Sequence, residues 1–284
     1  MTLHEKLAEA RDRLVAAGVS LADASIDVDL YARTILGWDR VRLLTEWRRA
    51  VPQSLEPRFS EWVARRERRE PSAYILGVRE FWGLEFIVTP AVLIPRPETE
   101  FVVDEALRLL ASTAAPHARI ADIGTGSGCV AVSVAHAHPS CRVVASDISR
   151  EALAVARQNA ARHGVGDRIE FVATSYLDGV DGPFDIITAN PPYVRDGARP
   201  ALSPAVRYEP EVALFGGAEG LRDIGGVLDT ALTGLRPGGW LVMEFGYGQD
   251  TDVADMVSAR TGLRLNHIRN DLQDIPRTAI IQRL

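Results

Sequence analysis

The pattern of apolar positions changes near residue 75. Over residues 3–70, apolar residues recur every three or four positions, as in "HEKLAEARDRLVAAG", with interruptions at Gly18 and Gly37. Recurrence at this period is typical of amphipathic helices, and glycine commonly follows the last helical residue. The pattern therefore predicts a small helical bundle over residues 1–75.

A short connector follows the predicted bundle. The stretch "EFWGLEFIVTP" alternates apolar and polar residues around Gly83, which predicts a β-hairpin. The next stretch, "VLIPRPETE", contains Pro95 and Pro97, which resist both a helix and an inner strand. We expect an ordered loop there and assign residues 76–100 to the hairpin and this loop.

From residue 101 to residue 284, apolar runs of strand length alternate with helical stretches. The helical stretch "SREALAVARQNAARHG" begins after Ser149 as a cap and ends at Gly164. This alternation predicts a mostly parallel, seven-stranded sheet with helices on both faces, an α/β fold whose ligands bind beyond the carboxyl ends of the strands. The predicted strands are residues 119–124, 142–147, 168–174, 184–190, 239–246, 263–268 and 277–284.

Composition excludes several classes of protein. With 46% hydrophobic and 25% charged residues, the 284-residue chain has an ordinary globular composition. It has no apolar run of membrane length and does not begin like a signal peptide, so we expect a cytoplasmic protein. The net charge of -6 argues against a general nucleic-acid binder. Cys129 and Cys141 are too few for a disulfide framework and are expected to be buried, reduced thiols.

Two features at the ends of the first two predicted parallel strands suggest a nucleoside site. The turn "DIGTGSG", residues 122–128, has its glycines in a GxGxG spacing, whereas a pyrophosphate-binding turn has GxGxxG. Asp147 ends the next strand, where a carboxylate can accept hydrogen bonds from both ribose hydroxyls. Alternatively, the turn binds nothing and Asp147 caps a helix. Together they favour a nucleoside without a phosphate chain, such as S-adenosylmethionine.

The fourth parallel strand ends in "NPPY", residues 190–193. Its prolines keep Asn190 out of helical angles, so the carbonyl groups of Asn190 and Pro191 can face a ligand. A planar amino group carries two N–H donors, which Asn190 Oδ1 and a backbone carbonyl can both accept. Holding these hydrogens out of the conjugated plane favours the attacking form of the nitrogen. We expect Tyr193 to stack on the planar group.

These motifs resemble those of class I, Rossmann-like methyltransferases that act on planar amino nitrogens of DNA adenine, RNA guanine or protein glutamine. Two longer stretches, residues 74–100 and "YEPEVALFGGAEGL" at residues 208–221, resemble the HemK/PrmC family of peptide chain release factor N5-glutamine methyltransferases. The resemblance covers nearly the whole chain. It implies methyl transfer from S-adenosyl-L-methionine to the glutamine of the Gly-Gly-Gln motif in bacterial-type release factors, with residues 1–75 recognising that substrate.

The resemblance also implies a role for each site residue. One position departs from the family pattern: an acid usually precedes the aromatic residue after the third strand, but here Ser175 precedes Tyr176. Whether Ser175 or Asp178 contacts the adenine is left open. The implied catalytic and substrate-binding residues are Asn190, Pro191, Pro192 and Tyr193; the implied cofactor-binding residues are Gly124, Thr125, Gly126, Ser127, Gly128, Asp147, Ser175, Tyr176 and Asn190; no metal ligand is implied.

The loop "PRPETE", residues 95–100, has two interpretations. In one, it borders the cofactor pocket and makes fixed polar contacts through Arg96, Glu98 or Glu100. In the other, it is a plain linker in which Thr99 caps the following helix.

Two other functions remain open at this point. A nucleic-acid adenine or guanine methyltransferase would need a basic binding face, which the acidic balance of the chain disfavours. A noncatalytic binder of release factors or ribosomes, with a vestigial pocket, is disfavoured by the intact NPPY motif. We expect a monomer with a protein substrate, no direct nucleic-acid substrate and no membrane partner.

Overall fold

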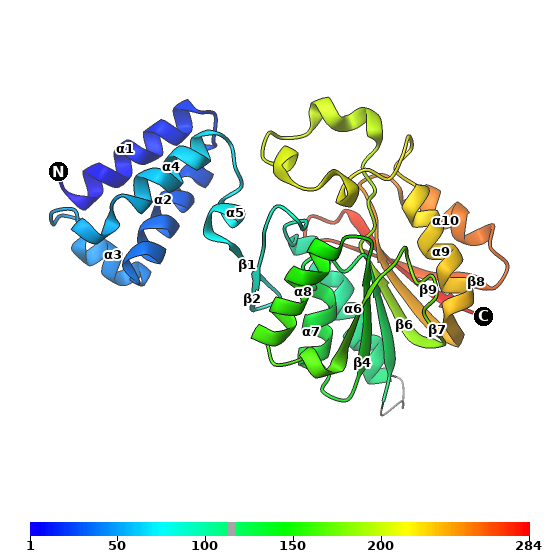
Figure 1. Ribbon diagram of the computed structural model, residues 1–284. Helices are drawn as coiled ribbons and strands as arrows, with labels where there is room; N and C mark the ends of the chain where they lie inside the picture. Colours follow the sequence, from blue (N-terminus) through cyan, green and yellow to red (C-terminus); the bar gives the residue numbers. More distant parts are fainter. Residues whose placement is uncertain (113–116) are drawn as a thin grey trace. The chain divides into compact units, whose positions relative to one another are not determined.

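The computed structural model describes residues 1–112 and 117–284 and divides into two compact units (Figure 1). The helical unit comprises residues 1–77 together with residues 203–208, and the sheet unit comprises residues 78–202 and 209–284. Each unit has its own buried hydrophobic core. The short segment at residues 203–208 therefore belongs to the helical unit although it follows NPPY in the chain.

The helical unit is built from short amphipathic helices whose ends are capped by their own sequence. Thr2 and Glu5 form a reciprocal capping box at the start of α1, and Ser20 caps α2. The core contains Leu14, Tyr31 and Phe59 among other apolar side chains. The helices are α1 Leu3–Ala16, α2 Leu21–Leu36, α3 Arg40–Glu46, α4 Arg58–Glu67 and α5 Ser72–Leu76, with a 3-10 turn at Gln53–Leu55.

The sheet unit begins with a two-stranded hairpin, β1 Val78–Phe81 and β2 Leu84–Ile87. Its two turn residues, Trp82 and Gly83, both have positive φ, which matches the twist of a two-residue hairpin. Asn159 secures the hairpin: its Oδ1 accepts from the Ile87 N–H at 2.7 Å, and its Nδ2 donates to the Ile87 carbonyl at 3.0 Å.

The seven-stranded sheet confirms the predicted α/β class. Its strand order is β5-β4-β3-β6-β7-β9-β8, and β9 runs antiparallel to both of its neighbours. From β3 the chain proceeds outward to β4 and β5 on one side and to β6 and β7 on the other, so the carboxyl ends of β3, β4 and β6 meet where the order reverses. The strands are β3 Arg119–Ile123, β4 Arg142–Asp147, β5 Ile169–Ala173, β6 Phe184–Ala189, β7 Leu235–Glu244, β8 Leu263–Asn270 and β9 Pro276–Arg283.

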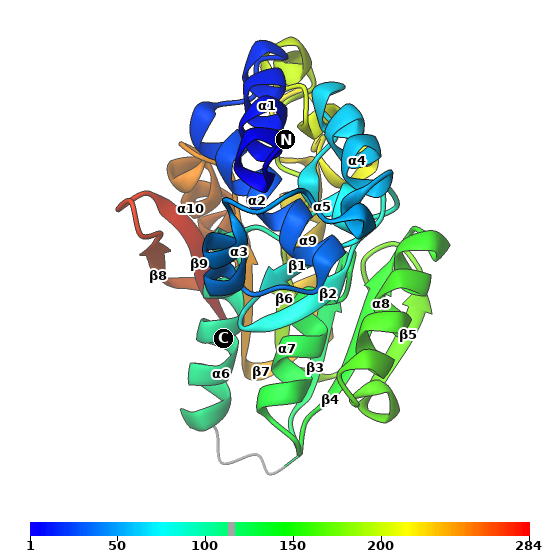
Figure 2. The ribbon, with the colours of Figure 1, turned by 90° about the vertical axis from the view of Figure 1, so that its left-hand side faces the viewer.

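Alternating strand residues build a core on each face of this sheet. Ile120 and Ile186 pack with residues of α6 and α7, whereas their neighbours Ala121 and Ile187 pack with residues of α9 and α10. Figure 2 gives a second view of these layers. The helices are α6 Glu100–Ser112, α7 Cys129–Ala137, α8 Arg150–Arg162, α9 Arg222–Gly234 and α10 Asp250–Ser258, with 3-10 turns at Pro97–Thr99, Gly166–Arg168, Asp196–Ala201, Val206–Tyr208 and Glu211–Ala213.

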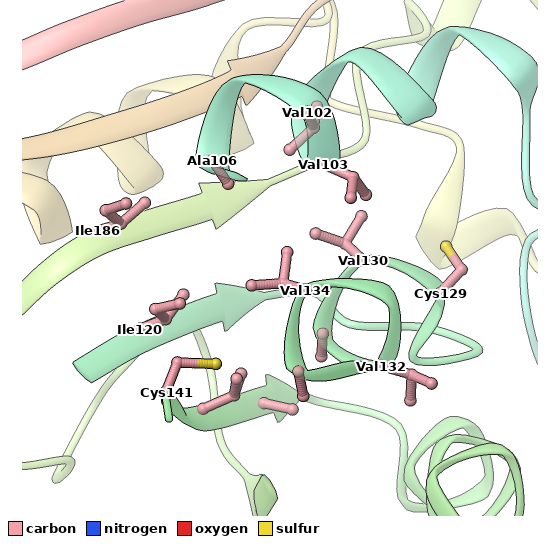
Figure 3. Packing of buried hydrophobic residues seen from close by; sticks show 14 of the residues in the cluster. Val102, Val103, Ala106, Ile120, Cys129, Val130, Val132, Val134, Cys141 and Ile186 are labelled. Atoms are coloured by element: carbon pink, nitrogen blue, oxygen red, sulfur yellow. The ribbon is translucent and has the colours of Figure 1, made fainter. Parts of the chain in front are cut away.

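Both cysteines lie in the core on the α6 and α7 side, among aliphatic side chains (Figure 3). They are free thiols, as expected, and burial raises the pKa of Cys129 to about 12. Cys129 is therefore uncharged at neutral pH. Within residues 1–112 and 117–284, no helix is long and apolar enough to cross a membrane.

Candidate active site

A pocket opens at the carboxyl ends of β3, β4 and β6, where the strand order reverses. All of its lining residues belong to the sheet unit. Ten of the residues predicted from the sequence lie in this lining: Gly124, Thr125, Gly126, Ser127, Asp147, Ser175, Tyr176, Asn190, Pro191 and Pro192.

The glycine-rich turn after β3 is shaped to hold a ligand close to its backbone. Gly124 and Gly126 have φ values of +68° and +56°, which L side chains rarely adopt. Gly124 lines the pocket, and a Cβ there would meet nothing within 4 Å, so it would project into open space. This open cradle fits a nucleoside cofactor.

Gly128, the third glycine of the turn, has a different task. It is not among the pocket-lining residues, and a Cβ there would lie 3.1 Å from the Cβ of Ala156. Its φ of +80° begins α7 at this close contact with α8. A side chain at Gly128 would therefore crowd α8, and the contact of Gly128 with the cofactor stays a prediction.

Asp147 is held at the end of β4 by two backbone donors. Its Oδ2 accepts from the Gly126 N–H at 2.9 Å and its Oδ1 from the Ser149 N–H at 2.8 Å. The hydroxyl of Ser149 caps α8 by accepting from Ala152 at 3.1 Å. Burial raises the pKa of Asp147 above its usual value. Since each carboxylate oxygen can accept more than one hydrogen bond, the fixed Asp147 can still receive ribose hydroxyls.

The end of the pocket near Ser175 and Tyr176 contains an acid that the sequence did not reveal. Asp178 is not among the lining residues, whereas Asp223 is, and its Oδ1 accepts from the Tyr176 hydroxyl at 3.0 Å. A Cβ on Gly226 would overlap the Tyr176 ring, so this ring position depends on a glycine in α9. No local pattern links residues 47 positions apart, which explains why Asp223 was missed.

Asn190 takes part in a buried hydrogen-bonded chain. Its Nδ2 donates to Thr99 Oγ1 at 3.0 Å, and that hydroxyl donates to Glu244 Oε2 at 2.7 Å. The Tyr193 hydroxyl donates to the other carboxylate oxygen, Oε1, at 3.0 Å. Burial raises the pKa of Glu244 to about 7, although the bonds from Thr99 and Tyr193 lower it.

This chain places Tyr193 differently from the stacking position we expected. Its ring packs against the core on the α9 and α10 side of the sheet and does not belong to the pocket lining. A buried tyrosine needs a partner for its hydroxyl, and Glu244 provides one. Tyr193 therefore anchors the end of the NPPY motif to the core.

The PRPETE loop borders the pocket through Pro95, Arg96 and Thr99. Arg96 donates to Glu209 Oε1 at 2.5 Å, and Glu209 Oε2 accepts from the Ile94 N–H at 3.1 Å. Glu209 is buried and lies in the stretch "YEPEVALFGG". The Thr99 hydroxyl is used by Asn190 and Glu244, so this residue supports the site and is not a helix cap.

Asp122 is a second buried acid that sequence reasoning passed over. It lines the pocket and accepts from the hydroxyls of Thr125 at 2.6 Å and Thr188 at 2.7 Å, so it holds the glycine turn in place. Burial raises its pKa to about 6. The sequence held a signal for both Asp122 and Glu244, because each is the single acid of its strand and has apolar neighbours.

The fold and this pocket define a class I methyltransferase. Residues 99–205 match the family model "Methyltransferase small domain", and residues 5–77 match the "PrmC N-terminal domain". Among solved structures, a methyltransferase from Pyrococcus furiosus has the same fold, with a TM-score of 0.51 and 19% identity over 72% of this chain and 90% of that chain.

Two curated relatives identify the family. The release factor glutamine methyltransferase of Bradyrhizobium diazoefficiens is 38% identical over 99% of this chain and 96% of that protein. The protein of the same name in Geobacter sulfurreducens is 42% identical over 92% of this chain and 89% of that protein. The chain belongs to the release factor glutamine methyltransferase family, as the resemblance in its sequence predicted.

Proposed function

We propose that this protein transfers a methyl group from S-adenosyl-L-methionine to the side-chain amide nitrogen (N5) of the glutamine in the Gly-Gly-Gln motif of bacterial-type peptide chain release factors. The observation that carries the proposal is the orientation of Asn190. Its Nδ2 is bound to Thr99, and no described residue donates to its Oδ1. That oxygen is available in a lined pocket to accept an N–H of a planar amide.

The residues of the site mainly align the reacting atoms. The cofactor supplies a methyl group on a sulfonium, which is a good leaving group. The cradle at Gly124 and Gly126 and the carboxylate of Asp147 would hold the nucleoside, and Asn190 Oδ1 with a carbonyl of Asn190 or Pro191 would hold both hydrogens of the glutamine amide. This alignment replaces a bimolecular encounter with a positioned one. A strong general base is not required, because the nitrogen protons become acidic as the nitrogen bonds to carbon.

The remaining assignments follow from this activity. We assign recognition of the release factor to the helical unit, which corresponds to the "PrmC N-terminal domain". Because release factors act in translation termination, we place the reaction in the cytoplasm, with a protein substrate and neither a membrane nor a direct nucleic-acid partner. We propose that the enzyme acts as a monomer.

The test is mass spectrometry of a bacterial release factor incubated with this protein and S-adenosylmethionine. The matched control is the same release factor with its Gly-Gly-Gln glutamine replaced. We expect one methyl group on that glutamine and none on the control. Methylation of both proteins, or of neither while the cofactor binds, would contradict the proposal, and duplex DNA and RNA would then be assayed as substrates.

A further inference from the structure

The side-chain amide of Asn190 can face a pocket in two ways. Only its oxygen accepts hydrogen bonds, whereas its nitrogen only donates them. A glutamine amide nitrogen brings two donors, so a site built to hold it needs the oxygen. The two orientations have nearly the same shape, and packing alone cannot choose between them. The choice must come from the hydrogen-bond partners.

When Glu244 is ionised, the partners of Asn190 form a chain of hydrogen bonds with only one consistent direction. Glu244 is 1% exposed and, when ionised, accepts hydrogen bonds without donating any. Thr99 is 2% exposed and its hydroxyl has a single hydrogen, which goes to Glu244 Oε2 at 2.7 Å. The Thr99 oxygen is left as an acceptor, so only the amino group of Asn190 satisfies it, at 3.0 Å. The oxygen of Asn190 then faces away from Thr99.

The position of Glu244 suits it to this task. It ends β7, and the preceding residue Met243 pairs with Ala189, which directly precedes Asn190. Glu244 is not among the residues that line the pocket. Its second oxygen accepts from the Tyr193 hydroxyl, so the carboxylate binds the PRPETE loop through Thr99 and the NPPY loop through Tyr193.

We propose that Glu244 is a positioning residue that acts through Thr99 to fix Asn190 with its amide oxygen toward the substrate. The inference rests on the proposed function for its effect on turnover. The arrangement of Asn190 itself does not depend on which substrate is methylated. The positioning role of Glu244 and the proposed methylation of release factors can therefore be refuted by different measurements.

The first test compares threonine variants at pH 8, where Glu244 is ionised because its pKa is about 7. Thr99→Val removes the hydroxyl and should lower kcat for release-factor methylation by about 10- to 100-fold, which is less than the roughly 100- to 1,000-fold loss when a preorganised group that contacts the reacting atoms is removed. Thr99→Ser keeps the hydroxyl and should restore most of the activity. The dissociation constant for S-adenosylmethionine should remain near the wild-type value in both.

Thr278→Val is the matched control. Thr278 is fully buried, pairs with Glu244 across β7 and β9, and its hydroxyl has no hydrogen-bond partner among the described residues. This variant makes the same chemical change beside the same carboxylate without cutting the chain of donors. Its kcat should match that of the wild type. An equal loss of kcat in Thr278→Val and Thr99→Val would overturn the proposal.

The second test is a double-mutant cycle with Glu244→Leu. If Glu244 acts through Thr99, this substitution should lower kcat in the wild-type background and have little further effect in Thr99→Val. The same fractional loss in both backgrounds would show that Glu244 acts by another route and would overturn the proposal.

The third measurement does not use the reaction. In a 15N-labelled sample without release factor, the side-chain NH2 resonances of Asn190, assigned with Asn190→Ala, should shift in Thr99→Val and Glu244→Leu but not in Thr278→Val. This shift would support the positioning role even if the wild type failed to methylate a release factor. Unchanged resonances in Glu244→Leu would overturn the role even if methylation were established.

Discussion

At the scale of single residues, the site depends on where hydrogen-bond acceptors are left available. Asn190 has its amino group bound to Thr99, Asp147 is fixed by the N–H groups of Gly126 and Ser149, and Asp122 holds Thr125. In each case, hydrogen bonds within the protein fix the orientation of a polar side chain that lines the pocket. The chemistry therefore relies on orientation more than on reactive side chains.

Substitution of Asn190 should therefore reduce turnover much more than it reduces cofactor affinity. Asn190→Ala should reduce turnover by roughly 3 kcal/mol, about 100-fold, because one preorganised acceptor for the glutamine amide disappears. The affinity for S-adenosylmethionine should change much less, because Gly124, Gly126 and Asp147 remain. Single-turnover kinetics and calorimetric titration of the cofactor measure the two quantities. Near-normal turnover would remove Asn190 from the mechanism.

Glu244 should also leave a signature in the pH dependence of stability. Burial raises its folded-state pKa from 4.5 to about 7, with Glu98 nearby raising it and Arg277 lowering it. Since the folded state then binds the proton more tightly than the unfolded state, this carboxyl contributes stability below about pH 4.5 that is lost as pH rises through about 7.

The comparison that isolates this effect is the wild type against Glu244→Gln. From pH 5 to pH 8, the unfolding free energy of the wild type should fall relative to that of Glu244→Gln. Urea denaturation of both proteins at each pH measures this difference. Asp122, whose pKa is also raised, is present in both proteins and cancels. A difference that stays constant across this range would show that Glu244 does not titrate there.

At the scale of elements, the loop after β6 is enclosed by the glycine-rich stretch that follows it. The N–H of Val194 donates to the Leu214 carbonyl at 2.8 Å, and the N–H of Gly216 donates to the Val194 carbonyl at 2.9 Å. A Cβ on Gly216 would overlap the carbonyl oxygen of Pro192. The stretch "YEPEVALFGG" thus shapes the NPPY loop through backbone contact.

A methyl group at this point should displace the loop. Gly216→Ala should cost about 1–3 kcal/mol of stability, as overpacking usually does, and should lower turnover because Asn190 moves with the loop. Gly197→Ala is the matched control, since a Cβ there meets nothing within 4 Å and Gly197 has no positive φ. Thermal unfolding and methylation assays distinguish the two. Equal stability and equal turnover of the two variants would show that a side chain at Gly216 does not displace the loop at Pro192.

The elements themselves were largely readable from the sequence. Strands such as Arg142–Asp147 alternate with helices, and apolar runs of strand length predicted all seven strands of the sheet. The supporting groups were not readable in the same way. Thr99 and Glu244 lie 145 positions apart, and only the folded sheet brings them together. A glycine needed for packing has the same sequence signal as one needed for a ligand, so only the fold shows how closely Gly128 approaches Ala156.

At the scale of the whole molecule, the helical unit contains a buried ion pair of its own. Asp27 and Arg66 form a buried ion pair at 2.7 Å, and the Ser72 hydroxyl donates to the second oxygen of Asp27. Removing one member of such a pair leaves a buried charge without its partner. This unit can therefore be weakened without altering any residue of the pocket.

Arg66→Ala should destabilise the helical unit by about 3–5 kcal/mol. If that unit recognises the substrate, kcat/KM for a release factor should fall while the dissociation constant for S-adenosylmethionine is retained. Arg11→Ala, which removes a surface pair with the exposed Asp12, should change neither quantity. Loss of cofactor binding in Arg66→Ala would contradict separate roles for the two units.

Residues 203–208 belong to the helical unit, although the chain on either side of them belongs to the sheet unit. Within that unit, the Tyr208 hydroxyl donates to the Arg68 carbonyl at 2.6 Å. A recombination event with one crossover near residue 77 would join a new set of helices to a segment adapted to the old set. If the helical unit recognises the substrate, exchange of substrate specificity between relatives requires two exchanged pieces, and the amino-terminal helices are inherited together with a loop more than a hundred positions later.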